Sequence, residues 1–306
     1  MNQGDYRYLK RLGYLARLKN ANKFQRAGIE LLKRIRRFFY VRHRVVPPES
    51  LESSRIIVVT IAFNNPDLVL IQAEALRKFL QEDYTHIVVD NSPDEHERAE
   101  VRTAAESWGS LYLPAPHNPY SWIDPSVSHA FALDWAWFQV VAKLKPEIAV
   151  YLDHDVFPTK PSSIRQLLSD KLVAGYQRKS DHRWLLWPGL LVMGFPEFSK
   201  FKVSFMPKAD TDAGGSLWWT VYTKIAPERI RFLDRQVVAF GDTSKRYGDG
   251  SPGEIHIFEG GWVHLVDGSG WSDGVAKMER LPRDGREDNL QGIIRLVARE
   301  TNEKEF

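Results

Sequence analysis

Hydrophobic and polar positions alternate along most of the chain in blocks that predict strands and helices in turn. The near-continuous apolar run Arg55–Phe63 has the pattern of a strand buried on both faces. Asn65 and Pro66 follow as an expected helix N-cap and first helical residue, and this helix extends to about Gln81. Further strands are expected at 85–90, 110–113 and 148–152, with helices at 94–107 and 126–143. This order predicts an α/β fold, a mostly parallel sheet flanked by helices.

Beyond residue 170 the pattern becomes mixed and rich in glycine and aromatic residues. One helix is expected at 213–224. The strands expected in this part are 172–176, 190–195, 230–233, 236–240 and 254–266.

The amino-terminal segment differs from the rest in charge. Residues 1–44 carry 13 Lys or Arg and 2 Asp or Glu, a net charge of +11, so the remainder of a chain with net charge +3 carries −8. Residues 6–44 are expected to be helical, with Pro47 and Pro48 in a linker. An apolar stripe formed by Phe24, Ala27, Leu31, Ile35 and Phe38 leaves two interpretations open: peripheral contact with an anionic membrane, or packing on the body or a partner.

Composition excludes some classes of protein. Without cysteine, the 306 residues have neither disulfides nor thiolate metal sites. No apolar run is long enough to span a bilayer, and the amino terminus lacks the apolar core of a signal peptide. We therefore expect a cytoplasmic protein, with peripheral membrane contact through residues 1–44 as one of the two interpretations of that segment. The acidic body argues against nucleic acid as a partner.

The expected strand 148–152 leads into two carboxylates, Asp153 and Asp155. In a strand, residues two apart point to one face, so both carboxylates are expected to aim at one spot. Hard oxygen ligands of this kind suit Mg²⁺ or Mn²⁺ shared with substrate phosphates. An Asp-x-Asp pattern also occurs by chance, but the end of a buried strand is where open α/β folds place ligands.

Four segments together resemble the GT-A fold and glycosyltransferase family 2 and its relatives. They are Val58–Asn64, Val88–Ser92, Asn118–Tyr120 with Ser128–Asp134, and Tyr151–Asp155. The resemblance covers about residues 55–165 well and the rest loosely. Charge and pattern predict a basic helical segment and linker at 1–50, and the resemblance implies a GT-A domain at 51–306, with a nucleotide-binding half at 51–165 and an acceptor half at 166–306.

The resemblance also implies a binding site for a nucleotide-sugar, most simply UDP-linked, with Mn²⁺ or Mg²⁺. Asp155 is the expected direct metal ligand, Asp153 contacts the ribose, the metal or a metal-bound water, and a late His264 completes the metal shell. The loop after Asn118 departs from the family pattern because it lacks a Gly and a downstream Asn. The residues expected to contact the nucleotide-sugar are Thr60, Ala62, Asn64, Asp90, Asn118 and Asp153.

An inverting transferase needs a base for the acceptor hydroxyl. Asp212 is preferred and Asp210 is second, although a carboxylate before a helix is also a common N-cap; Asp242 and Glu254 remain rivals. Asp90 is also compatible with an ordinary turn, and His264 with a core position. Trp187, Trp218 and Trp219 are expected either to stack on an acceptor sugar or to pack in the core.

The resulting hypothesis is a metal-dependent hexosyltransferase-type enzyme that transfers a sugar to a hydroxyl of a glycan or lipid-linked acceptor, with inversion favoured by the resemblance. One alternative is a non-catalytic module on the same fold that binds glycans or a partner. A sugar nucleotidyltransferase is less favoured, because Phe63-Asn64-Asn65-Pro66 replaces the Gly-rich basic loop expected after its first strand.

Overall fold

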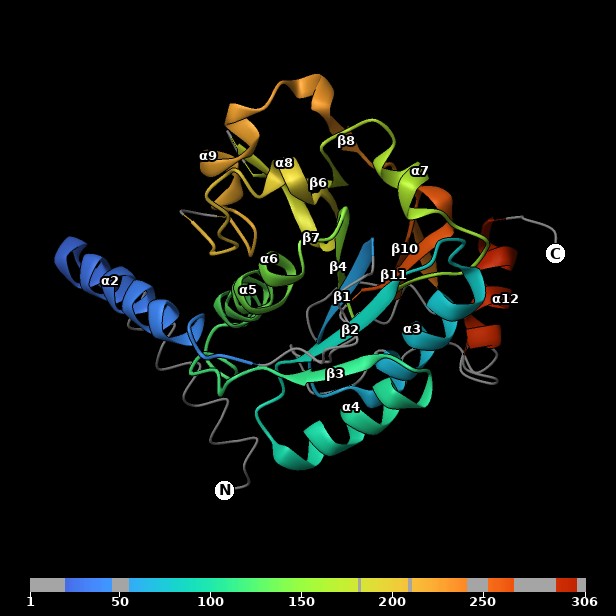
Figure 1. Cartoon of the computed structure of the whole chain (residues 1–306), viewed down its shortest axis with the longest axis horizontal. Helices are drawn as coiled ribbons and strands as arrows, with labels where there is room; N and C mark the ends of the chain where they lie inside the picture. Colours follow the sequence, from blue (N-terminus) through green and yellow to red (C-terminus); the bar gives the residue numbers. More distant parts are fainter. Residues whose placement is uncertain are drawn as a thin grey trace.

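The computed structural model describes residues 20–45, 55–180, 183–208, 211–240, 253–266 and 290–301. In this part of the chain the strands form a seven-stranded sheet, in the order β3-β2-β1-β4-β7-β6-β8, and a four-stranded sheet, β5-β11-β10-β9 (Figure 1). The strands are β1 (Ile56–Ala62), β2 (Thr85–Asp90), β3 (Leu111–Pro114), β4 (Ile148–Asp153), β5 (Val156–Pro158), β6 (Val173–Ser180), β7 (Arg183–Gly194), β8 (Ile230–Phe232), β9 (Arg235–Phe240), β10 (Gly253–Phe258) and β11 (Trp262–Leu265).

The helices alternate with the strands in the first half of the chain. The α-helices are α2 (Lys23–Tyr40), α3 (Pro66–Phe79), α4 (Glu95–Ser107), α5 (Pro125–Ala136), α6 (Ala142–Leu144), α7 (Ile164–Leu168), α8 (Phe195–Phe198), α9 (Leu217–Thr220) and α12 (Leu290–Thr301). A π-helical turn, Trp137–Val141, joins α5 to α6, and short 3₁₀ turns lie at Tyr222–Lys224, Pro227–Arg229 and Glu259–Gly261.

The larger sheet is mostly parallel, as predicted. β1 pairs in parallel with β2 and β4, and β2 with β3, whereas β7 runs antiparallel to β4 and β6. The register places Ala62 beside Asp90 and Ile61 beside Asp153. The carboxyl ends of three strands therefore meet at one edge of the sheet.

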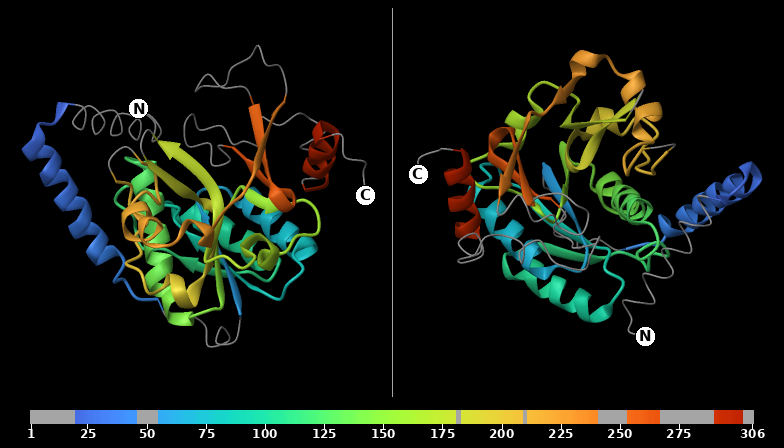
Figure 2. Two further views of the ribbon diagram at one scale, coloured as in Figure 1. Left: turned by 90° about the horizontal axis from the view of Figure 1, so that it is seen from above. Right: turned by 180° about the vertical axis from the view of Figure 1, so that it is seen from behind.

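Helices cover both faces of the parallel strands (Figures 1 and 2). Ile57 and Val59 pack towards α5 in one core cluster, while Ala62 packs with α3 and α4 in another. Every residue of β1 is buried, which explains why its sequence shows no polar alternation. Asn65 caps α3 by accepting a hydrogen bond from the Leu68 amide, and Pro66 follows at the first helical position, as predicted.

Two sequence predictions fail at glycines. The single strand expected at 254–266 is a hairpin of β10 and β11, because Gly260 and Gly261 have φ values of 78° and 77°, a conformation that glycine favours. The helix expected at 213–224 is reduced to α9 and a 3₁₀ turn, since Gly214 with φ 90° cannot belong to a right-handed helix.

Among the helices that the structure describes, none has the length and apolar character needed to cross a bilayer. The expected linker around Pro47 and Pro48 lies outside the described residues.

Candidate active site

The chain passes from the larger sheet to the smaller one through a turn that contains both predicted carboxylates. β4 ends at Asp153, His154 and Asp155 form the turn, and β5 begins at Val156. The alternation of strand side chains therefore does not extend to Asp155, and the expectation that both carboxylates aim at one spot from one strand was wrong in that respect. Each carboxylate has a different imidazole neighbour.

Gln72 on α3 holds the turn between β4 and β5 through hydrogen bonds to its backbone. Its side-chain amide donates to the backbone carbonyls of Asp153 (2.8 Å) and Val156 (2.6 Å), one on each side of the turn. Gln72 is fully buried, and its amide oxygen accepts from the hydroxyl of Thr60 at 2.6 Å. All of its polar atoms are thus engaged, which fixes the backbone that presents Asp155.

The structure brings Asp155 and His264 together across 109 residues of sequence, through the pairing of β5 with β11 that sets His264 beside Val156. Nε2 of His264 lies 3.5 Å from Oδ2 of Asp155, and both side chains are buried. Nδ1 of His264 lies 3.3 Å from Nδ1 of His256, the residue opposite it on β10. Nε2 of His256 in turn lies 3.2 Å from Glu254.

This chain of contacts has a chemical consequence for His264. If Glu254 accepts the proton of His256 Nε2, then His256 Nδ1 is an acceptor and His264 Nδ1 must donate to it. The lone pair of His264 Nε2 then faces the carboxylate of Asp155. Two acceptors directed at each other are unfavourable unless a cation lies between them, and their separation suits a small divalent ion, whose neighbouring ligand atoms are about 3 Å apart.

Asp153 has a different partner, His129 near the start of α5. Nε2 of His129 lies 3.0 Å from Oδ1 of Asp153. Burial alone would lower the pKa of His129, but the carboxylates of Asp153, Asp212 and Asp155 together raise it above its usual value. The shift favours the protonated form of His129, whose positive charge offsets part of the negative charge that gathers at this edge of the sheet.

Because Gly189 has no side chain, β7 can approach the Asp153 carboxylate at the end of β4 closely. A Cβ atom at this position would lie 2.5 Å from Oδ2 of Asp153 and 2.1 Å from the Trp187 ring. Trp187 itself is buried, with its ring centroid 4.4 Å from that of His264 and with the Arg178 guanidinium 5.0 Å from its centroid. Of the two alternatives left open for Trp187, its burial favours packing in the core over stacking on an acceptor sugar.

Asp212 is exposed and lies near enough to His129 to raise its pKa. Its Oδ2 is 3.1 Å from Nη1 of Arg178, and its Oδ1 accepts from the Ala213 amide. Trp218 and Trp219 are half-buried, and Lys208 lies 4.1 Å from the centroid of the Trp219 ring. Of the other candidate bases, Glu254 is engaged with His256, while Asp210 and Asp242 lie outside the described residues.

The residues expected to bind the nucleotide differ in accessibility. Asn64 follows β1 in a left-handed conformation, with φ 49°, and its amide oxygen is buried without a hydrogen-bond partner. Such an orphaned acceptor at a strand end is a feature that a bound ligand can complete. Its own backbone amide donates to Ser92 Oγ at 2.8 Å.

The remaining nucleotide candidates are already engaged. Asp90 is fully buried and accepts from the Ser92 amide (2.8 Å) and the Tyr112 hydroxyl (2.9 Å). Asn118 donates to the Asn91 side chain and to the Ser128 carbonyl. Thr60 and Ala62 are fully buried within β1. These residues shape the strand ends, and no ligand contact follows from their positions alone.

The described residues contain no group of three or more His, Asp or Glu side chains arranged to hold a metal ion. Asp155 and His264 supply two donors. A site of two protein ligands fits Mg²⁺ or Mn²⁺ when phosphate oxygens and water complete the shell, and an imidazole ligand favours Mn²⁺. The donor set therefore fits an ion that is bound together with a diphosphate.

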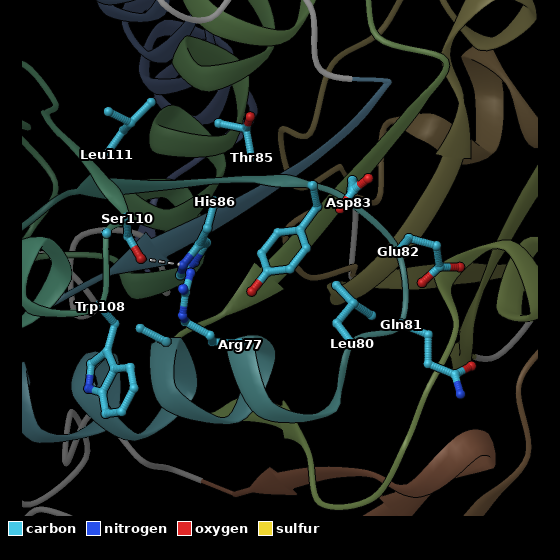
Figure 3. A pocket seen from close by; sticks show the side chains of 13 residues that line it. Arg77, Leu80, Gln81, Glu82, Asp83, Thr85, His86, Trp108, Ser110 and Leu111 are labelled. Atoms are coloured by element: carbon cyan, nitrogen blue, oxygen red, sulfur yellow. Dashed lines mark hydrogen bonds between the residues drawn. The ribbon is translucent and has the colours of Figure 1, made fainter.

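A polar cavity of about 590 Å³ lies at the opposite edge of the sheet, where β2 and β3 begin (Figure 3). His86 and Ser110 form part of its wall, with His86 Nδ1 2.7 Å from Ser110 Oγ. His86 Nε2 lies 2.9 Å from the Thr60 hydroxyl, and burial lowers the pKa of His86 to about 3. A neutral His86 thus links this cavity through Thr60 to Gln72.

No protein-family model matches the chain, and no curated protein matches it in sequence. Solved structures to which the chain is similar include several glycosyltransferases. They include a mannosyltransferase, PcManGT from Pyrobaculum calidifontis in complex with GDP-Man and Mn²⁺, at 17% identity, a TM-score of 0.42, and coverage of 67% of this chain and 62% of that one.

A second similar structure is the galactosyltransferase LgtC with donor and acceptor sugar analogues, at 16% identity and a TM-score of 0.34, covering 48% of this chain and 60% of that one. The bifunctional glycosyltransferase WbbM matches at 12% identity and a TM-score of 0.35, covering 51% of this chain and 34% of that one. The chain spans less than two thirds of each of these proteins. Similarity this distant carries no residue assignment.

Sequence patterns missed four contributors to the site: Gln72, His129, Gly189 and His256. His256 could have been found, because Glu254 and His256 alternate on one face of a strand opposite His264. Gln72, His129 and Gly189 gave no such signal, since their roles depend on contacts between elements distant in sequence.

Proposed function

We propose that this protein is a metal-dependent glycosyltransferase. It transfers a sugar from a nucleotide-sugar, most simply a UDP-sugar, to a hydroxyl of a glycan or lipid-linked acceptor. The observation that supports this most directly is that two buried side chains, Asp155 and His264, place Oδ2 and Nε2 3.5 Å apart. Their arrangement at the carboxyl edge of a parallel sheet suits a cation shared with a diphosphate.

In this proposal Asp155 and His264 hold the ion, and Asp153 contacts the ribose or a metal-bound water while His129 balances its charge. A bound divalent cation supplies electrostatic stabilisation of the leaving diphosphate. The buried, unpaired amide oxygen of Asn64 accepts a hydrogen bond from the nucleotide. Gln72, which holds both ends of the Asp153–Val156 turn, keeps the ligands in position.

For the acceptor, Asp212 is the proposed base. As the acceptor oxygen bonds to the anomeric carbon, the bond from that carbon to the diphosphate oxygen breaks, and the hydroxyl proton passes to Asp212. Arg178 orients Asp212 through their 3.1 Å contact and also lies over Trp187, which touches His264. This series of contacts connects the proposed base to the metal ligands. Inversion at the anomeric carbon is the expected outcome.

The direct test is release of nucleoside diphosphate from a panel of UDP- and GDP-sugars in the presence of Mn²⁺, with glycan acceptors added. The proposal predicts turnover that stops when the ion is chelated and resumes when Mn²⁺ is restored. Glycan binding with neither nucleotide binding nor turnover for any donor would instead favour a non-catalytic module.

A further inference from the structure

Helix α2 is amphipathic, but its basic side faces the body and its apolar side faces outward, the reverse of the usual arrangement of a surface helix. Its body-facing side carries Lys33, Arg36, Arg37 and Tyr40, which recur at helical spacing. Its outward side carries large apolar residues whose side chains are between 44% and 87% exposed. We call this outward side the apolar face of α2; it consists of Phe24, Leu31, Leu32, Ile35, Phe38 and Phe39.

Charge fixes the inverted orientation. Arg37 forms a salt bridge with Asp134, a fully buried carboxylate on α5, and Lys33 lies 3.8 Å from Asp124, the N-cap of α5. Arg36 donates to the Tyr120 hydroxyl at 3.4 Å. Burial raises the pKa of Asp134, although Arg37 opposes that shift, so without Arg37 the carboxylate would be still harder to ionise. The helix therefore cannot rotate its apolar face onto the body without unpairing a buried charge.

An apolar face that extends along about 22 Å of helix, from Phe24 to Phe39, is large for an exposed surface and indicates a partner. The side chains around it are basic: Lys23, Arg34 and Arg42 are exposed. The acidic residue of the helix, Glu30, lies 3.3 Å from Lys33. The amino-terminal end of α2 also projects from the body, as both views show (Figures 1 and 2).

We infer that α2 rests on an anionic lipid surface, with its apolar face in the headgroup region and its basic flanks against the lipid phosphates. A second copy of the chain fits less well, because two such helices placed face to face would bring basic flanks together without acidic partners. This inference concerns where the protein acts and is independent of the proposed reaction.

Vesicle flotation of the full chain tests the inference without any sugar nucleotide. The chain should float with vesicles of phosphatidylcholine and phosphatidylglycerol in equal parts and at least tenfold less with pure phosphatidylcholine. Ile35→Glu should reduce the partition onto anionic vesicles at least tenfold. Trp108→Glu is the matched control, because Trp108 on the far side of the sheet is 39% exposed against 45% for Ile35, and it should leave the partition unchanged. A melting temperature near that of the wild type establishes that each variant is folded.

Labelling gives a second measurement that reports which face inserts. Because the chain contains no cysteine, Leu31→Cys on the apolar face and Arg26→Cys beside the body-facing side can each carry a single nitroxide. Anionic vesicles should protect the Leu31→Cys label from a water-soluble relaxation agent and leave the Arg26→Cys label accessible.

Three results would overturn the inference. One is equal protection of the two labels, and another is equal binding to neutral and anionic vesicles. The third is absence of vesicle binding. If the chain that fails to bind is monomeric, the apolar face of α2 would instead fit an acidic protein partner. If it forms a dimer that Ile35→Glu dissociates, the face would serve self-association.

Discussion

Each edge of the parallel sheet carries a histidine in a polar setting, the buried His86 at the amino edge and the partly buried His129 at the carboxyl edge, yet their electrostatics are opposite. At the amino edge, burial lowers the pKa of His86 to about 3, and Ser110 and Thr60 lie within hydrogen-bond distance of its ring nitrogens. At the carboxyl edge, three carboxylates raise the pKa of His129 despite burial. A cavity of about 590 Å³ lies at the amino edge and one of about 300 Å³ beyond the carboxyl ends of β2 and β3, but the converging charges and the unpaired acceptor on Asn64 lie at the carboxyl edge.

The difference shows which property marks a functional site. A cavity whose buried polar atoms already have partners gains little from a ligand, whereas charges gathered around an incomplete set of donors are costly until a ligand completes them. We therefore propose the carboxyl edge as the site of chemistry and the amino edge as its structural support, connected to it through Thr60 and Gln72.

The largest difference between the edges should appear on neutralising one carboxylate at each. Asp155→Asn removes a charge from the proposed metal site, and turnover should fall on the order of 10³-fold, because the ion loses its charged ligand. Asp83→Asn beside the amino-edge cavity should leave turnover unchanged. Steady-state kinetics with saturating Mn²⁺ measures both, and equal activities of the two variants would remove the distinction between the edges.

A smaller effect is expected from Gly189→Ala, which adds one methyl group at the carboxyl edge. The methyl would meet Asp153 at 2.5 Å and the Trp187 ring at 2.1 Å, so Asp153 must move. A displacement near 1 Å should lower turnover by about 100-fold. Gly28→Ala is the matched control, because nothing lies within 4 Å of its added carbon, and it should keep full activity with a slightly higher melting temperature.

Gln72→Met tests whether Gln72, which connects the two edges, positions the proposed metal ligands. The variant keeps the volume of the side chain and removes both donors to the Asp153–Val156 turn, so the apparent Mn²⁺ affinity should fall about tenfold. Thr60→Val breaks the contact with the Gln72 oxygen but leaves both donors in place. Both variants should lose stability, and only Gln72→Met should weaken the dependence on Mn²⁺. If the two variants changed Mn²⁺ affinity equally, Gln72 would have no specific positioning role.

The smallest effect concerns stability at the amino edge. His86 has a pKa of about 3 in the folded protein against 6.5 for the ordinary side chain, so between these values the unfolded chain binds a proton that the native state does not. The free energy of unfolding should therefore fall as pH decreases from 6.5 towards 3, by at most about 1.4 kcal/mol per pH unit from this group. Urea unfolding across this range should give a shallower slope for His86→Gln than for the wild type, and parallel slopes would contradict the assignment.

The sequence predicted the strand ends far better than the contacts between them. Strand boundaries at Ile56–Ala62 and Thr85–Asp90 follow from local hydrophobic runs, which is why these elements agree with the structure. The family resemblance implied that Asp155 and His264 would be neighbours, and the structure places them 3.5 Å apart. Their neighbours His129 and Gln72 lie on helices, and their roles depend on how those helices pack, which no local pattern encodes.

Helix α2 shows a different limit of sequence analysis. Its apolar stripe was compatible with packing on the body and with membrane contact, because periodicity identifies a face but not its direction. The direction depends on Arg37 meeting Asp134 on α5, 97 residues away in sequence. Likewise, Thr60 inside β1 and Asn118 in the loop after β3 were expected to contact a ligand, but their observed partners include other side chains.

Calorimetric titration of nucleoside diphosphates, with and without Mn²⁺, tests the central claim most directly. We predict binding that requires the ion, that is lost in Asp155→Asn and in His264→Ala, and that is retained in Asp83→Asn. Binding that is independent of Mn²⁺, or that persists unchanged in Asp155→Asn, would contradict a metal–diphosphate site at the carboxyl edge of the sheet.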